Sequence, residues 1–160
     1  MPTYSGIWTL TQQMQSAGGP ALWPGVAQPG QQLYVGTFYG AGGQSMFTWV
    51  CPVGVTSVSV VCVGGGGSGG ARGYTGNPSY SGNGGAGLGY KNGIAVTPGN
   101  SYTVACADSK YGLSESANGS DSYFISAGTV NGGGGQRASG ATGGTGGTYI
   151  GDGGGNGGTG

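Results

Sequence analysis

Short stretches of alternating apolar and polar residues give the clearest structural signal along this chain. In residues 47–51 the side chains of Phe47, Trp49 and Cys51 fall on one face of an extended segment. Residues 56–63 are rich in β-branched residues and alternate in the same way. Both stretches therefore predict β-strands with one buried face.

Similar patterns predict the remaining strands. Strands are expected at 33–38, 101–106 and 122–126, and the residues expected to share buried faces are Val58, Val60 and Cys62, and Tyr102, Val104 and Cys106. Turns are expected at Pro52-Val53-Gly54 and Pro98-Gly99-Asn100. Asn92-Gly93, flanked by 88–90 and 94–96, predicts a β-hairpin turn. About six short strands between such turns, without a long helical period, predict an all-β fold, a small β-sandwich or jelly-roll-like domain spanning 33–160.

Residues 1–32 have a different pattern and are expected to form a separate N-terminal arm. Ile7, Leu10 and Met14 follow helical spacing, which predicts one short amphipathic helix. Trp8 and Trp23 would be costly to leave exposed on a short arm. They either fold back on their own domain or dock onto another subunit, and we favour docking. These five residues are the expected anchoring residues.

Two glycine tracts follow predicted strands. Glycine occupies 13 of the 26 residues in 64–89 and 16 of the 29 residues in 132–160, without the strict period of collagen. The tracts are flexible linkers, loops pinned to the sandwich, or extended polyglycine II helices that hydrogen-bond to neighbouring ones. On the third interpretation, ordering requires several such segments, from this chain or from other copies. The residues expected to make lattice or oligomer contacts are Gly64, Gly65, Gly66, Gly67, Gly132, Gly133, Gly134 and Gly135.

The composition argues against most kinds of chemistry. The chain has 160 residues, no His, and four basic residues balanced by four acidic ones. The acids Asp108, Glu115, Asp121 and Asp152 are scattered, so we expect no enzyme, no metal site and no cofactor. So few cations would neutralise few phosphates, which argues against nucleic-acid binding. No apolar stretch reaches the roughly 20 residues of a membrane span, so membrane insertion is not expected.

Two motifs that resemble functional sites have simpler explanations. Gly64, Gly66 and Gly69 match a dinucleotide-binding pattern, but the residues that follow predict no helix. The spacing of Cys51, Cys62 and Cys106 matches no zinc site. We expect three reduced thiols in the core, with a Cys62–Cys106 disulfide as the alternative.

The residues that follow Phe47 resemble a known family. The stretch FTWVCPVGVTSVSVVCVGGGG (47–67) is similar to the glycine-rich domain of bacteriophage tail fibres and related virion proteins, as are AGLGYKNGIAVTPGNSYTV (86–104) and Ser122-Tyr123-Phe124 followed by Val130 and the Gly132 tract. More weakly, Gly6-Ile7-Trp8-Thr9-Leu10 with Trp23-Pro24 resembles the N-terminal openings of structural proteins of cyanophages and other marine phages.

The resemblance implies a non-enzymatic virion component, made in the host cytoplasm and assembled into the particle. A tail fibre of this kind is usually a homotrimer. It would anchor through its N-terminus to a tail, nozzle or baseplate protein and project toward a receptor on the host surface. A capsid decoration or head-fibre protein is the alternative.

Overall fold

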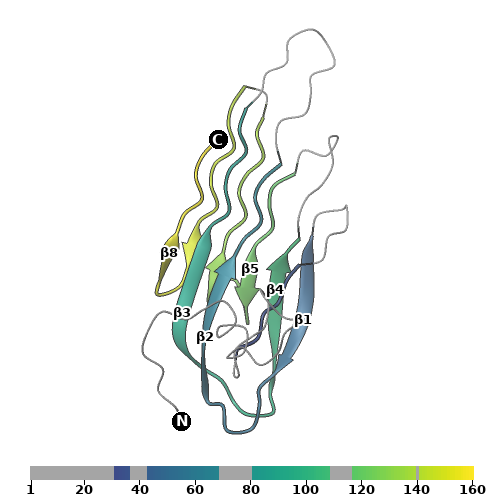
Figure 1. Cartoon of the computed structure of the whole chain (residues 1–160), viewed down its shortest axis with the longest axis vertical. Helices are drawn as coiled ribbons and strands as arrows, with labels where there is room; N and C mark the ends of the chain where they lie inside the picture. The colour runs from purple at the N-terminus through teal and green to yellow at the C-terminus, as the bar shows by residue number, and fades with distance from the viewer. Residues whose placement is uncertain (1–30, 37–42, 69–80, 109–116, 140) are drawn as a thin grey trace, which may run out of the picture. The chain divides into compact units, whose positions relative to one another are not determined.

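The computed structural model describes residues 31–36, 43–68, 81–108, 117–139 and 141–160 (Figure 1). The chain divides into two units, Met1–Leu33 and Tyr34–Gly160. All described residues from Tyr34 onward belong to the second unit. The expected arm and its anchoring residues Ile7, Trp8, Leu10, Met14 and Trp23 lie outside the described residues.

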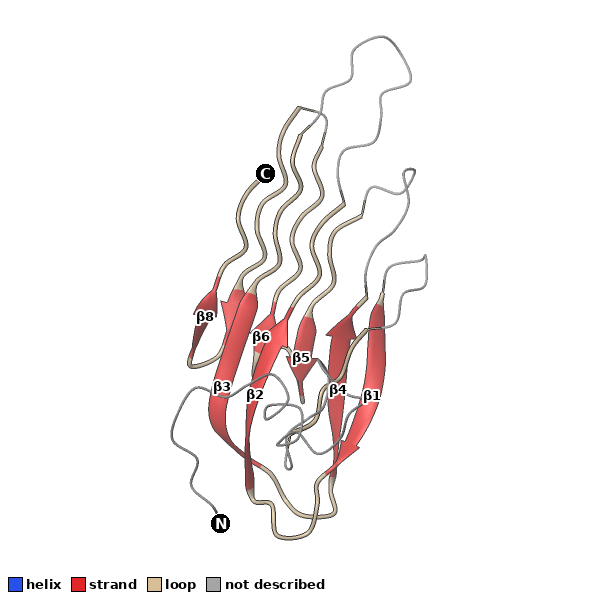
Figure 2. Ribbon diagram, in the orientation of Figure 1, coloured by secondary structure: helices blue, strands red, loops and turns tan. Residues whose placement is uncertain are grey.

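The described part of the second unit contains β-strands and no helix. The strands are β1 (Gln44–Val50), β2 (Ser57–Val63), β3 (Leu88–Ala95), β4 (Ser101–Ala107), β5 (Ser122–Phe124), β6 (Asn131–Gly132), β7 (Tyr149–Ile150) and β8 (Gly153–Gly155). One sheet has the order β1-β4-β5-β6-β7 and the other has the order β2-β3-β8, and every pairing is antiparallel (Figure 2). The all-β prediction is confirmed.

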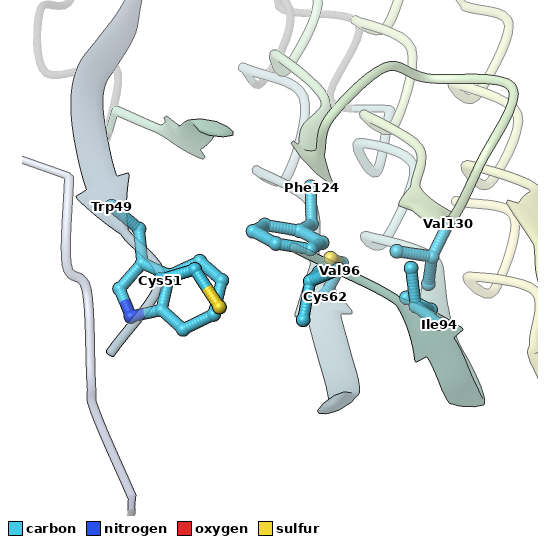
Figure 3. Close-up of a cluster of buried hydrophobic side chains, with 7 residues drawn as sticks. All are labelled: Trp49, Cys51, Cys62, Ile94, Val96, Phe124 and Val130. Atoms are coloured by element: carbon cyan, nitrogen blue, oxygen red, sulfur yellow. The ribbon is translucent and has the colours of Figure 1, made fainter. Parts of the chain in front are cut away.

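The two sheets face each other across a small hydrophobic core. Strands β2 and β3 of the smaller sheet contact β5, β6 and β7 of the larger one. The buried residues between them are Trp49, Cys51, Cys62, Ile94, Val96, Phe124 and Val130 (Figure 3). Trp49 packs edge-on against Phe124, with ring centroids 5.7 Å apart. The faces predicted from alternation in β1 and β2 therefore point into this core.

The predicted strand at 33–38 is wrong in its described part, because residues 33–36 form no strand. Tyr34 packs on Phe47 at a centroid distance of 5.3 Å, whereas Leu33 and Val35 are exposed. At Gly36 a Cβ would lie less than 3.0 Å from the carbonyl of Ala107, so this segment passes close to the end of β4. The ring of Tyr34 thus packs this segment against the core, although residues 33–36 form no strand.

The predicted hairpin at Asn92-Gly93 is also wrong. Strand β3 continues through both residues, and its register against β2 shifts between Val58 and Val60. Gly93 has φ +61°, the left-handed conformation that a β-bulge requires at this kind of position. The same glycine conformation serves a tight turn or a bulge, which is why the dipeptide misled the prediction.

The predicted turns around Gly54 and Gly99 are both present. Their φ values are +85° and +82°, which favour glycine. The second turn is held by Cys51, the buried residue that follows β1. The backbone N–H of Cys51 donates to the carbonyl of Asn100, and the N–H of Gly99 donates to the carbonyl of Cys51, both at 2.8 Å. These turns lie at the end of the sandwich opposite the glycine tracts (Figure 1).

Candidate functional site

Six extended runs, five of them rich in glycine, continue from the strands of the sandwich (Figure 2). Run 1 (64–68) follows β2, run 2 (81–87) precedes β3, run 3 (117–121) precedes β5, run 4 (133–138) follows β6, run 5 (141–148) precedes β7 and run 6 (156–160) follows β8. Their side-by-side arrangement makes them the most distinctive feature of the described structure.

The hydrogen bonds of run 4 rotate through three neighbours with a period of three residues. Its six consecutive N–H groups donate from Gly133 and Gln136 to carbonyls of run 5, from Gly135 and Ala138 to carbonyls of run 1, and from Gly134 and Arg137 to side-chain oxygens of run 3. Three residues per turn, with bonds made to neighbouring segments, is the period of a polyproline II-type helix. Of the three interpretations of the glycine tracts, the lattice of extended helices describes these runs.

The runs form two rows that extend the two sheets. Runs 3, 4 and 5 continue from β5, β6 and β7, and runs 1, 2 and 6 continue from β2, β3 and β8. Bonds form within a row, as from Gly67 to Gly84 at 3.0 Å, and between rows, as from Gly87 to Gly133 at 2.8 Å. Because these hydrogen bonds extend in two dimensions, backbone N–H and C=O groups of the runs find partners within the same chain without a continuous β-ladder.

Glycine is required where one run faces another. A Cβ added at Gly64, Gly67, Gly134 or Gly135 would lie less than 3.0 Å from a backbone carbonyl oxygen of a neighbouring run. Positions that recur every three residues and face solvent carry side chains instead. In run 5 the exposed residues Thr142, Thr145 and Thr148 alternate with pairs of glycines. Close backbone packing therefore explains the glycines that face a neighbouring run.

The structure brings the two predicted glycine sets together within one chain. Gly64–Gly67 lie in run 1, Gly132 ends β6, and Gly133–Gly135 begin run 4. Gly135 donates to the carbonyl of Gly65 at 2.9 Å. Contact of these glycines with another copy stays a prediction.

Sequence reasoning missed run 3 and its two polar side chains. Oδ1 of Asp121 accepts a hydrogen bond from Gly134 at 2.8 Å, and Oδ1 of Asn118 accepts one from Arg137 at 3.0 Å. These oxygens occupy places that carbonyls fill elsewhere in the lattice. Their separation of three residues matches the lattice period and is the signal that could have revealed them.

The reactive side chains of the described residues are either structural or buried. Cys51, Cys62 and Cys106 are free thiols and are buried. Burial raises the pKa of Cys62 to about 11, and the neighbouring Cys106 adds to the rise. Burial and the nearby Asp108 also raise the pKa of Cys106. These shifts disfavour the thiolate, which is the reactive form.

Within the described ranges, no three His, Cys, Asp or Glu side chains gather where they could hold a metal ion. No helix among the described residues has the length and hydropathy to cross a membrane.

Comparisons with other proteins give no family assignment. No protein-family model, curated protein or solved structure matches the sequence or the fold.

Proposed function

We propose that this chain is a structural protein of a bacteriophage particle, a tail fibre or its virion-proximal part. The observation that carries the proposal is the six-run lattice built directly onto a small sandwich. Its order comes from backbone hydrogen bonds and close packing of glycines, which suits a passive support. The resemblance of residues 47–67 and 86–104 to glycine-rich tail-fibre domains supports the same function.

In this proposal residues 1–32 attach the protein to a tail, nozzle or baseplate protein, and the glycine-rich domain projects toward a receptor on the host cell. The protein is made in the host cytoplasm and functions in the virion as a homotrimer, without enzymatic activity. Because the lattice is completed within one chain, the trimer is supported by the resemblance and not by any need to order the glycine tracts.

The location of the protein on the particle tests this proposal. Antibodies against the purified chain, applied to intact phage particles, are expected to label the tail in negative-stain images. Labelling of the head would favour the capsid decoration or head-fibre alternative. Absence of the protein from purified particles, measured by mass spectrometry, would refute both.

Adsorption gives a second measurement. Purified protein that contains the receptor-facing part is expected to compete with phage for host cells and to slow adsorption. Alanine substitutions at Asp108 and Asp121 in correctly folded protein are expected to leave adsorption unchanged, since neither carboxylate has a catalytic role in this proposal.

A further inference from the structure

We propose that the outer face of β2, β3 and β8, together with runs 1, 2 and 6, is the surface through which copies of this chain associate. We call this surface the β2–β3–β8 face. The inference deepens the proposed homotrimer and rests on it. It names the surface, which neither the resemblance nor the comparisons identify.

The first observation is a contiguous group of exposed apolar side chains. Val61 is 66 % exposed and lies directly across from Tyr90, and Val63 is 54 % exposed and lies directly across from Leu88. Leu88 and Tyr90 are each 39 % exposed. Cross-strand partners point to the same side of a sheet, so the four side chains form one patch. Contiguous apolar patches of this kind mark contact surfaces more often than scattered apolar residues do.

The second observation is that glycines extend this patch at positions where no neighbouring segment of the same chain excludes a side chain. Gly155 pairs with Leu88, and Gly158 follows it by one lattice period. A Cβ at either glycine would meet no atom within 4 Å. Gly66 follows Val63 by the same period and is exposed. The glycines that face another run in this chain are explained by close packing, whereas Gly155 and Gly158 have open space in front of them.

The opposite row of the lattice has a different surface. Its exposed residues include Asn118, Gln136, Thr142, Thr145 and Thr148 and the charged Arg137. Runs 1, 2 and 6 also expose polar side chains, at Asn83, Asn156 and Thr159, but they contain no charged residue. On the β2–β3–β8 face, the outward residues of the strands include no charged side chain, since Lys91 pairs with Val60 and shares its inward side. Two copies of such a face can meet without desolvating a charge, which would be costly.

The size of the face is sufficient for self-association. Seven strand residues and five run residues span about 38 Å, and three strands span about 14 Å, from the standard rise and spacing of extended chains. The face therefore offers about 500 Å² per copy. If the faces of three copies meet around one axis, they offer about 1,500 Å² in all, which is within the range of a specific interface. Further copies of this chain carry the same apolar patch without a charged side chain, and they fit this face.

Substitutions at the open glycines separate association from folding. In Gly158→Val and Gly155→Val the added Cβ meets no atom of its own chain within 4 Å, whereas the side chain would collide with a second copy packed on the glycine. Val61→Asp places a charge in the apolar patch. Thr145→Val and Thr145→Asp are the matched controls on the polar row. The molar mass is measured by size-exclusion chromatography with light scattering, and the melting temperature is measured in parallel.

We expect wild type and both Thr145 variants to have three times the chain mass of 15.4 kDa. We expect Gly158→Val, Gly155→Val and Val61→Asp to shift to the single-chain mass, with circular dichroism spectra like that of wild type. A wild-type monomer would overturn the inference, as would variants that keep the wild-type mass. A dimer that the same variants dissociate would support the face and refute the trimer. The proposed location on the virion is tested separately, on particles that carry unmodified protein. The location and the association surface can therefore each be refuted without the other.

Discussion

The backbone N–H of Gly134 donates a 2.8 Å hydrogen bond to Oδ1 of Asp121, a side chain from a different run of the lattice. Gly134 is buried. If the carboxylate is removed, this N–H has no protein acceptor in place. An unsatisfied buried donor costs about 1–3 kcal/mol.

Asp121→Ala is therefore expected to lower the free energy of unfolding by about 1–3 kcal/mol, measured by urea denaturation. Asp121→Asn keeps an acceptor oxygen in nearly the same place and is the matched control, with a smaller expected loss. Equal losses in the two variants would show that the charge, and not the acceptor, matters at this position.

Gly135→Ala tests the close packing of the lattice. The added Cβ would collide with the carbonyl of Gly84, so the runs must separate, and overpacking of this kind costs about 1–3 kcal/mol or more. Gly128→Ala is the control, because the nearest atom to its Cβ lies at 3.9 Å and its φ is not left-handed. That variant is expected to be neutral or slightly stabilised. Thermal unfolding followed by circular dichroism distinguishes the two outcomes.

Gly93→Ala tests the bulge in β3. The Cβ would meet no atom, so any loss comes from the left-handed backbone at φ +61°. The expected loss is about 1–2 kcal/mol in the free energy of unfolding. Asn adopts this conformation more readily, and Gly93→Asn is expected to lose less. If Ala and Asn were tolerated equally, the left-handed conformation would not be the constraint.

The buried thiol of Cys62 predicts a pH dependence of stability. Its pKa is raised by burial from 9.0 to about 11, so the folded state holds its proton over a range in which the unfolded chain has lost it. The contribution of this group is complete below pH 9 and decreases as the pH rises toward 11, by about 1–2 kcal/mol in total. Denaturant unfolding of wild type and Cys62→Ala at several pH values isolates the part of the pH dependence of the free energy of unfolding that is due to Cys62. A difference between the two proteins that stays constant with pH would contradict the assignment.

The sandwich could be predicted from the sequence where side chains alternate. The faces of β1 and β2 followed from Trp49 and Cys62 because burial of alternate residues leaves a period of two. The prediction failed at Asn92-Gly93, where one backbone conformation serves two structures, and at 33–36, where one aromatic contact replaces strand pairing.

The glycine lattice was predictable only in part. Gly64–Gly67 and Gly133–Gly135 could be named as contacts because ordered glycine backbone needs hydrogen-bond partners. Which run lies beside which could not be deduced, because glycine has no side chain to record its neighbour. Only residues with side chains indicate how a run is oriented. Thr142, Thr145 and Thr148 face outward, and the side chains of Asn118 and Asp121 accept hydrogen bonds from a neighbouring run.

The three-residue period of the runs also constrains how this sequence can change in length. Deleting one residue within run 5 would rotate every later position by about a third of a turn, directing a threonine into the backbone of run 4 or run 6. Removing three residues would restore the faces and only shorten the run. Tolerated insertions and deletions in these segments should therefore come in multiples of nine nucleotides, a bias that sequencing of variants selected for correct folding would reveal.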